Sequence, residues 1–504
     1  MFVEISMLDD RIRCAALRGK ITSAADAAQL VRNGMRVGTS GFTRAGDAKA
    51  VPLEIARRAR EESEPLRITL MTGASLGNDT DRILTEARAL ERRLPFQVDA
   101  TLRRAINRGE VMFVDQHLSE TVELLRDNRL GALDLAIIEA VAITETGGIV
   151  PTTSVGNSAT FAALAQKVIV EINLAQPLAL EGLHDIWSPA ARPGRAPLPL
   201  MRVEDRVGTP CIQIAPEKIA AIVITNQPDS SSTVLPADAD TALIAGHLVE
   251  FFQHEVSRGR LPKQLPPLQA GIGTIANAVL SGFAASPFEA LTLYSEVLQD
   301  STFDLFDAGK LAFASGASVT LSAKRQEQVL NDIARYRDRL VLRPQEVSNH
   351  PEVIRRLGLI AINTALEADI YGNVNSTHVG GTHMMNGIGG SGDFARNASY
   401  AVFATKSIAK DGRISSIVPM VPHCDHNEHD VDVIVTERGL ANLTGLAPRE
   451  RALTVIEHCA HPLYRDILRD YYRDAAALGG HTPHRLDAAF ALHTRFAQTG
   501  SMLP

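Results

Sequence analysis

A chain of 504 residues is long for a single hydrophobic core, so its length predicts two domains. Hydrophobic residues make up 45% of the sequence and charged residues 22%, which is typical of a soluble globular protein. The formal net charge of −7 argues against a general nucleic-acid-binding surface.

Cysteine use and hydropathy indicate the compartment. The four cysteines are widely separated and form no C-x-x-C pair, so we expect reduced thiols and a cytoplasmic protein. No uncharged apolar run is long enough to cross a membrane, and residues 1–13 lack the layout of a signal peptide. We therefore expect neither a membrane nor a nucleic acid as a partner.

The first half of the chain alternates short apolar runs with helical stretches. Helices are expected over residues 8–19, 24–33 and 51–62, the second of them capped by Ser23. The apolar runs are continuous rather than alternating, which is typical of parallel strands covered on both faces. The order strand, turn, helix predicts an open α/β sheet. The expected strands lie at residues 35–38, 67–72, 111–114, 133–138, 167–172 and 219–225.

A polar segment rich in Pro and Ser follows the last of these strands, at residues 226–237. We interpret it as the linker between an N-terminal domain, residues 1–225, and a C-terminal domain, residues 238–504. The second half repeats the same rhythm, with a helix over residues 241–257. Its expected strands lie near residues 291, 317, 359, 401, 414 and 431.

One expected strand, residues 290–294, ends just before Glu296. Ligands bind at the carboxyl ends of strands in open α/β sheets. A carboxylate near the backbone N–H groups of glycine turns, such as those at residues 271–273 and 386–394, can act as a nucleophile beside an oxyanion-binding site. A glutamate in this position is also often an ion-paired surface residue, and the pattern alone leaves both interpretations open.

A second possible nucleophile is Ser75, in a G-x-S-x-G pattern that follows an expected strand. The pattern is short and frequent by chance, and strand–helix turns are commonly rich in Gly and Ser. We interpret it as a turn.

A cluster of possible metal ligands lies at His423, Cys424, Asp425 and His426, with His429 close by. No second pair of ligands has a recognisable spacing, so we favour a polar, hydrogen-bonded loop and expect no metal. The glycine turns match neither the phosphate-binding loop of nucleotide triphosphatases nor the full dinucleotide-binding pattern.

Seven stretches, in the same order, resemble the acetyl-CoA hydrolase/transferase family, and within it most of all the succinyl-CoA:acetate and propionyl-CoA:succinate CoA-transferases. The likeness runs from about Arg11 to Leu503. The stretches are residues 39–42 (TSGF), 147–157 (GGIVPTTSVGN), 271–273 (GIG), 294–297 (YSEV), 347–349 (VSN), 371–377 (YGNVNST) and 385–394 (MNGIGGSGDF).

The resemblance implies two open α/β domains of the CoA-transferase type, with the active site in the cleft between them. It implies that Glu296 is the nucleophile and that the backbone amides of Ile272 and Gly390 bind the oxyanion. It also implies a homodimer, and coenzyme A as a substrate rather than a permanently bound cofactor. Glu437 matches a recurrent acidic residue of the cleft.

The residues that match coenzyme A contacts of the family lie in three parts of the chain. Asn349 also matches a position that supports the reacting carboxylate. The set comprises Gly271, Ile272, Gly273, Thr274, Ile275, Asn349, Gly390 and Lys410.

The activity implied is the transfer of CoA between a short acyl-CoA (succinyl-CoA, propionyl-CoA or acetyl-CoA) and a carboxylate such as acetate or succinate. It would proceed through an anhydride and a glutamyl-CoA thioester. The alternative is hydrolysis of acetyl-CoA or another short acyl-CoA at the same site. The chain departs from some acetate-specific members, which carry arginines after the strand equivalent to residues 219–225. Residues 226–232 contain none, so contacts from that loop to a substrate carboxylate are not carried over.

Overall fold

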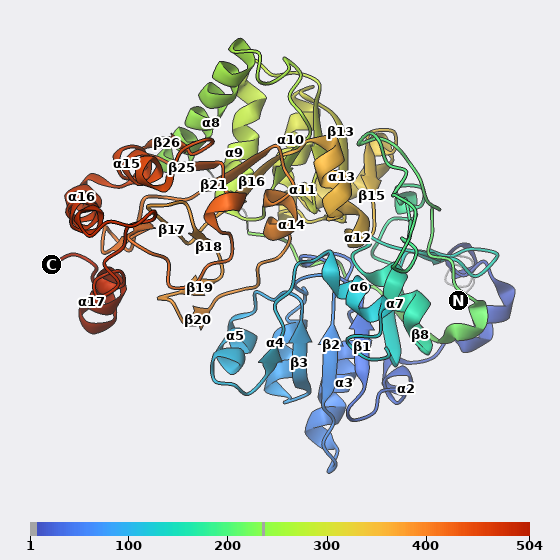
Figure 1. Cartoon of the computed structure of the whole chain (residues 1–504). Helices are drawn as coiled ribbons and strands as arrows, with labels where there is room; N and C mark the ends of the chain where they lie inside the picture. Colours follow the sequence, from blue (N-terminus) through green and yellow to red (C-terminus); the bar gives the residue numbers. More distant parts are fainter. Residues whose placement is uncertain (1–7, 234–236) are drawn as a thin grey trace. The chain divides into compact units, whose positions relative to one another are not determined.

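The computed structural model describes residues 8–233 and 237–504, and its internal contacts divide the chain into two compact units (Figure 1). The described part of the first unit comprises residues 8–233, 293–300 and 313–353, and that of the second comprises residues 237–292, 301–312 and 354–504. Glu296 therefore belongs with the first unit. The sequence-based boundaries, 1–225 and 238–504, stay a prediction, because grouping by contacts does not establish which parts fold independently.

The first unit contains a seven-stranded sheet in the order β4-β3-β2-β1-β5-β8-β9. Every neighbouring pair is parallel, which confirms the α/β prediction made from the continuous apolar runs. The strands are β1 (Arg36–Thr39), β2 (Ile68–Met71), β3 (Leu90–Leu94), β4 (Met112–Phe113), β5 (Leu135–Ala140), β8 (Lys167–Asn173) and β9 (Ile219–Thr225).

Helices cover both faces of this sheet (Figure 1). One face forms a buried apolar cluster that includes Val37 of β1, with α2 (Ala24–Ala28), α3 (Val51–Glu61), α4 (Thr80–Glu86) and α5 (Ala100–Asn107). The ring of Phe161, on α7 (Ser158–Leu164), lies over Gly38, the next residue of β1. Successive residues of a strand face opposite sides, so α7 covers the other face.

Two local predictions in the first unit fail. The single helix expected over residues 8–19 is interrupted: residues 8–11 are α-helical, residues 12–14 are not helical, and the 3-10 helix η1 (Ala15–Lys20) follows them. Strand β3 was not predicted, because three of its five residues are charged. Its Arg93 is fully buried and pairs with Asp81, with 2.9 Å between Nε and Oδ1, so the tertiary partner makes a charged strand possible.

The second unit holds strands in the order β10-β16-β21-β25-β26, of which the first four run parallel and β26 runs antiparallel to β25. The strands are β10 (Leu268–Ala270), β16 (Ile360–Thr364), β21 (Tyr400–Ala404), β25 (Val433–Thr436) and β26 (Gly439–Asn442). The principal helices are α8 (Ala239–Ser257), α9 (Thr274–Gly282), α15 (Pro448–Cys459), α16 (Pro462–Ala477) and α17 (Ala491–Thr499).

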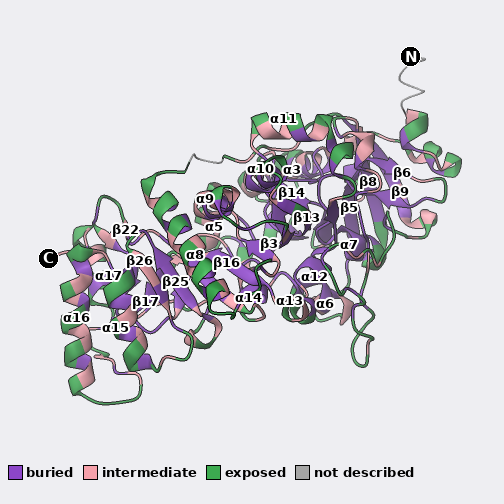
Figure 2. Ribbon diagram, turned by 90° about the horizontal axis from the view of Figure 1, so that it is seen from above, coloured by how far each residue is buried: buried purple, intermediate pink, exposed green. Residues whose placement is uncertain are grey.

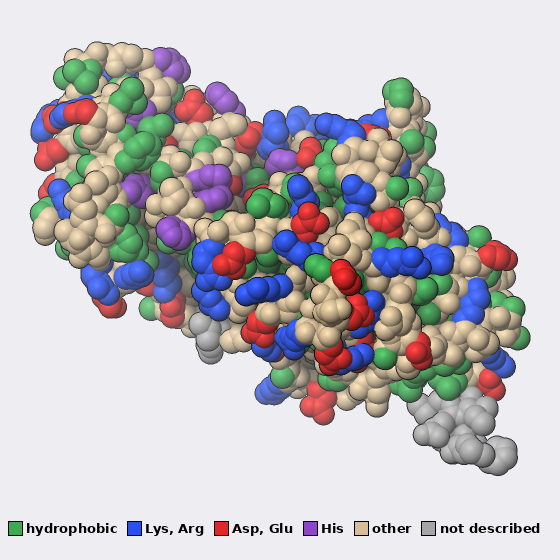
Figure 3. Space-filling view, turned by 90° about the horizontal axis from the view of Figure 1, so that it is seen from below, with side chains coloured by type: hydrophobic (Ala, Val, Ile, Leu, Met, Phe, Trp, Pro, Cys, Tyr) green, Lys and Arg blue, Asp and Glu red, His purple; other side chains and the backbone are tan. Residues whose placement is uncertain are grey.

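Burial follows the strands, which are largely purple in Figure 2, whereas exposed residues lie on the outer faces of the helices. Basic and acidic side chains are interspersed on the face shown in Figure 3. Within the part of the chain that the structure describes, no helix combines the length and apolar character needed to span a bilayer.

Candidate active site

Glu296 follows β11 (Leu291–Tyr294), as expected, and is followed in turn by β12 (Val297–Leu298). The backbone carbonyl of Glu296 accepts hydrogen bonds from Ala317 N, at 2.7 Å, and Ser318 N, at 3.0 Å. The residue is 8% exposed. The carboxylate therefore starts from a fixed backbone position and is largely removed from water.

Asn349 orients this carboxylate. It terminates α12 (Gln345–Ser348), and its Nδ2 donates to Glu296 Oε1 at 2.7 Å. The hydroxyl of Tyr294 donates to the carbonyl of Val347 at 2.6 Å, which ties α12 to the end of β11. The structure thus brings together two of the predicted site residues, Glu296 and Asn349, inside the first unit.

The predicted coenzyme A turn connects β10 to α9 in the second unit. Gly271 N donates to the carbonyl of Ile362 on β16 at 2.8 Å, so the turn leaves the sheet from a fixed point. Gly273 caps α9 with φ of +102°, a conformation that L side chains rarely adopt. Its neighbours Ile272, Thr274 and Ile275 are partly exposed at the first turn of the helix, where backbone N–H groups lack intrahelical partners.

Gly390 lies in the other glycine turn, directly before the short helix α14 (Ser391–Ala395). Ser391 Oγ donates to the carbonyl of Ile388 at 2.7 Å and lies 3.1 Å from Nε2 of the buried His426. This turn is therefore held by side-chain contacts and not by its glycines alone.

Glu437 follows β25, at the same edge of the second unit's sheet as the Gly271 turn, because β10 and β25 run in the same direction. Its carboxylate accepts hydrogen bonds from Ser407 N, Ser407 Oγ and Arg438 Nε. Burial acts to raise the pKa of Glu437, but these donors outweigh it and lower the pKa. Glu437 is thus a fixed anion that anchors the segment after β21.

Lys410 lies in the hairpin between β22 (Ile408–Ala409) and β23 (Ile414–Ser415), also in the second unit. It is exposed, and its ammonium lies 5.1 Å from the centre of the Phe496 ring on α17. A cation over an aromatic face keeps its charge accessible to an anionic ligand while its stem is packed.

Ser75 is buried in the loop between β2 and α4, and its carbonyl accepts a hydrogen bond from Arg44 N at 3.1 Å. This backbone contact supports the interpretation of residues 73–77 as a turn.

Hydrogen bonds hold the loop at residues 423–426 against neighbouring residues of the second unit. Asp425 accepts from Ser376 N at 2.7 Å and from Thr377 Oγ1 at 2.9 Å, and His423 Nε2 lies 3.2 Å from Asp425 Oδ1. These contacts fit the polar loop that we favoured. Among the residues that the structure describes, no group of three or more His, Cys, Asp or Glu side chains has the arrangement of a metal site.

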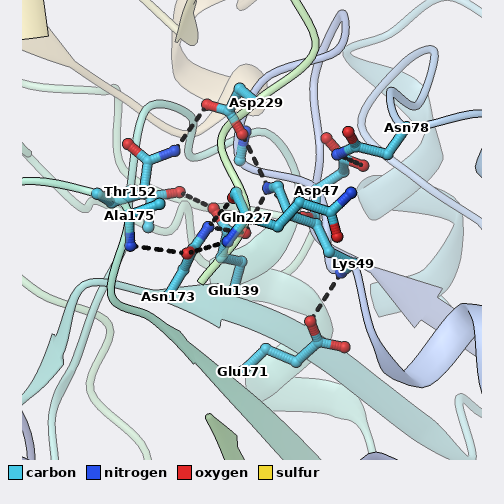
Figure 4. Close-up of polar contacts among 12 residues, drawn as sticks. Asp47, Lys49, Asn78, Glu139, Thr152, Glu171, Asn173, Ala175, Gln227 and Asp229 are labelled. Atoms are coloured by element: carbon cyan, nitrogen blue, oxygen red, sulfur yellow. Dashed lines mark hydrogen bonds and ion pairs between the residues drawn. The ribbon is translucent and has the colours of Figure 1, made fainter. Parts of the chain in front are cut away.

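Sequence reasoning missed a buried charge cluster at the carboxyl edge of the first unit's sheet (Figure 4). Lys49 Nζ lies 2.5 Å from Glu139 Oε2 and 2.8 Å from Asp229 Oδ1. Glu171 accepts hydrogen bonds from the backbone N–H groups of residues 49, 50 and 51 at the start of α3. One signal was available: Glu139 and Glu171 each interrupt a continuous apolar strand.

Burial dominates the electrostatics of this cluster. It raises the pKa of Asp47 to about 6 and that of Glu139 to about 8. Burial opposes the charge on Lys49, but Asp229, Glu139 and Asp47 together raise the Lys49 pKa well above its usual value. Burial thus opposes the ionisation of both carboxyl groups, and the nearby Lys49 ammonium partly offsets this effect.

Comparison with known proteins decides the family. The acetyl-CoA hydrolase/transferase N-terminal domain model matches residues 6–224, and the C-terminal domain model matches residues 327–472. The chain belongs to the acetyl-CoA hydrolase/transferase family. It is therefore an enzyme of that family, as the motifs suggested.

Similar proteins of this family carry two kinds of name. The succinyl-CoA:acetate CoA-transferase of Clostridium kluyveri is 49% identical, over 98% of this chain and 92% of its own length. The propanoyl-CoA:succinate CoA transferase of Escherichia coli is 45% identical, over 95% of this chain and 98% of its own length. The acetyl-CoA hydrolase of Schizosaccharomyces pombe is 46% identical, over 99% of both chains.

Solved structures support the fold. RipA from Yersinia pestis matches with a TM-score of 0.71 and 22% identity, covering 94% of this chain and 99% of its own. The 4-hydroxybutyrate CoA-transferase of Porphyromonas gingivalis matches with a TM-score of 0.63 and 21% identity, covering 91% of this chain and 98% of its own. The family member described here thus has an α/β fold shared with CoA-transferases.

Replacing Asn349 with alanine removes the hydrogen bond to Glu296. A hydrogen bond to a charged group contributes about 1.5–3 kcal/mol, so kcat is expected to fall by roughly ten- to a hundredfold. Steady-state assays of acyl-CoA turnover check this. Asn331→Ala, at the exposed end of α11 (Ala323–Asn331), is the matched control and is expected to keep the wild-type rate. An Asn349→Ala enzyme of wild-type kcat would contradict the orienting role.

Glu139 makes stability depend on pH. Its folded-state pKa, about 8, lies above the ordinary value of 4.5, so the contribution to stability is complete below about pH 4.5 and is lost as pH rises towards 8. Between pH 5 and 8 the wild type should lose at least about 1 kcal/mol relative to Glu139→Gln, the equivalent of one pKa unit. Urea unfolding across this range measures the difference. Exposed Glu217→Gln is the control, and a difference between wild type and Glu139→Gln that does not change with pH would contradict the prediction.

Proposed function

We propose that this enzyme is a CoA-transferase in which Glu296 carries the acyl group and then coenzyme A. The observation that carries the proposal is the Glu296 carboxylate, which is nearly buried at a strand end and oriented by Asn349. An oriented carboxylate with little surrounding water is a better nucleophile than a hydrated one.

The reaction is balanced without a cofactor. A Glu296 oxygen attacks the thioester carbonyl of an acyl-CoA, and the C–S bond breaks to give an acyl-glutamyl anhydride and CoA thiolate. The thiolate attacks the glutamyl carbonyl, which releases the acyl group as a free carboxylate and leaves a glutamyl-CoA thioester. A second carboxylate reverses these steps and leaves as the new acyl-CoA. Coenzyme A is thus a substrate that is covalently bound only during turnover.

The tetrahedral intermediates carry an oxyanion that needs fixed donors. We assign this role to the backbone N–H groups of Ile272 and Gly390. Both residues lie in held glycine turns, and donors that need no reorganisation stabilise a developing charge most effectively. The first turn of α9 and Lys410 would bind coenzyme A, since both offer groups that suit an anion.

The proposed substrates follow the names of similar proteins. The donor would be succinyl-CoA, propionyl-CoA or acetyl-CoA and the acceptor acetate or succinate, because the Clostridium kluyveri and Escherichia coli proteins carry these names. A homodimer is proposed on the resemblance alone.

Hydrolysis is the second candidate, favoured by the 46% identity to the acetyl-CoA hydrolase of Schizosaccharomyces pombe. The two activities share every step up to glutamyl-CoA. They differ in whether water or a carboxylate consumes this intermediate, so exclusion of water decides between them.

The test is to follow acyl-CoA products and free thiol from succinyl-CoA, with and without acetate. We expect acetyl-CoA to form rapidly with acetate and little free thiol to appear without it. Glu296→Gln should lower transfer by at least about a thousandfold, because it removes the nucleophile, whereas exposed Glu327→Gln should not. Equal thiol release with and without acetate would replace the transferase by the hydrolase.

A further inference from the structure

The segment after β9 contains one carboxylate, that of Asp229, which accepts as many hydrogen bonds from the surrounding protein as a bound ligand would. We call residues 226–232 the strap. The side chain of Asp229 in the strap is 6% exposed and accepts hydrogen bonds from four donors, which lie in three separate segments of the first unit. Its donors are Lys49 Nζ (2.8 Å) and Gly46 N (3.1 Å) to Oδ1, and Gln176 Nε2 (2.9 Å) and Thr153 Oγ1 to Oδ2.

We call the four donors, Gly46, Lys49, Thr153 and Gln176, the cradle. The cradle lies at the carboxyl edge of the sheet, where an open α/β sheet ordinarily binds ligands. Glu139 and Asn173 stand at the carboxyl ends of the neighbouring strands β5 and β8, and Figure 4 shows both pointing towards Lys49 and the strap. Asn173 Nδ2 donates to Glu139 Oε2 at 3.0 Å and to the strap carbonyl of Gln227 at 2.7 Å. The protein's own carboxylate thus occupies this edge of the first unit's sheet.

The backbone of the cradle can approach the Asp229 carboxylate closely. Gly46 has φ of +63°, and a Cβ at this position would lie 2.4 Å from Ser154 Oγ, so only glycine allows its N–H to reach Asp229. Lys49 is fully buried and also donates to the carbonyl of Asp47 at 2.8 Å. A buried carboxylate with donors of this kind is strongly specified in position.

Thr153, one of the donors, connects the cradle to Glu296. The carbonyl of Thr153 accepts from Val319 N at 2.9 Å, and Val155 N donates to the carbonyl of Ala317 at 2.9 Å. Ala317 and its neighbour Ser318 in turn donate their N–H groups to the carbonyl of Glu296. Two backbone layers therefore separate the Asp229 carboxylate from the backbone of the proposed nucleophile.

The far end of the strap joins the same layers. Ser232 N donates to the carbonyl of Leu321 at 2.8 Å. Thr320 N donates to the carbonyl of Leu298, two residues after Glu296, at 3.0 Å. A strap released from Lys49 would therefore loosen the pairing of β12 with β14 (Ser318–Val319).

We propose that Asp229 is a positioning residue: its carboxylate fills a carboxylate-binding cradle centred on Lys49, latches the strap, and so holds the backbone that presents Glu296. The inference rests on the proposed role of Glu296 as nucleophile. Asp229 itself touches no reacting atom in this account. Because a misplacement of about 1 Å can cost about a hundredfold in rate, the latch has a measurable effect on the reaction.

The kinetic test compares Asp229→Ala and the better-packed Asp229→Asn with exposed Ser231→Ala, the control on the same strap. Both Asp229 variants should lower kcat by about ten- to a hundredfold with little change in KM for the acyl-CoA, since the cradle binds neither substrate. A kcat within about twofold of wild type in Asp229→Asn and Asp229→Ala would overturn the positioning role.

A binding test examines the cradle without reference to activity. Formate should raise the melting temperature of Asp229→Ala, because it can occupy the vacated carboxylate position beside Lys49. The wild type and an Asp229→Ala, Lys49→Met double variant should not respond. An Asp229→Ala melting temperature that formate raises no more than that of the wild type would overturn the carboxylate cradle.

The two proposals fail in different ways. If Glu296→Gln keeps wild-type transfer, the proposed function is wrong whatever Asp229 does. If Glu296→Gln is inactive and the Asp229 variants keep wild-type kcat, the proposed function stands and the latch alone is wrong.

Discussion

The hydrogen bond from Asn349 to Glu296 is the contact on which the chemical account depends. A nearly buried carboxylate loses its hydration, so its charge and direction must be set by protein groups. Asn349 can donate this hydrogen bond only if α12 ends at the correct place. The Tyr294 hydroxyl fixes that helix to the end of the strand that precedes Glu296. Hydrogen bonds thus connect the end of the strand, the end of α12 and the proposed nucleophile within the first unit.

The parallel sheets of the two units use their carboxyl edges differently. In the first unit this edge is filled by a buried cluster around Lys49, which holds the protein's own Asp229. In the second unit it carries the Gly271 turn, with partly exposed backbone, and the fixed anion Glu437. Buried charge of this kind is costly unless it is fully paired, so the pairs around Lys49 help to fix the geometry of this edge.

Periodicity and strand ends were readable from the sequence, whereas tertiary pairing of charges was not. Continuous apolar runs indicated a parallel sheet, and the glutamate after residues 290–294 indicated a strand-end carboxylate. Strand β3 was missed because Arg93 looks unsuited to a strand until its partner Asp81 is known. Composition likewise could not predict the burial of Asp229, because its donor Lys49 lies far away in the sequence.

The most direct measurement is the mass of peptides from enzyme treated with succinyl-CoA in the absence of any acceptor. We expect the peptide containing Glu296 to gain coenzyme A as a thioester, free succinate to appear in equal amount, and acetate then to remove the adduct as acetyl-CoA. Turnover with acetate by an enzyme whose Glu296 peptide never gains that mass, or gain of the mass at another residue, would contradict Glu296 as the nucleophile.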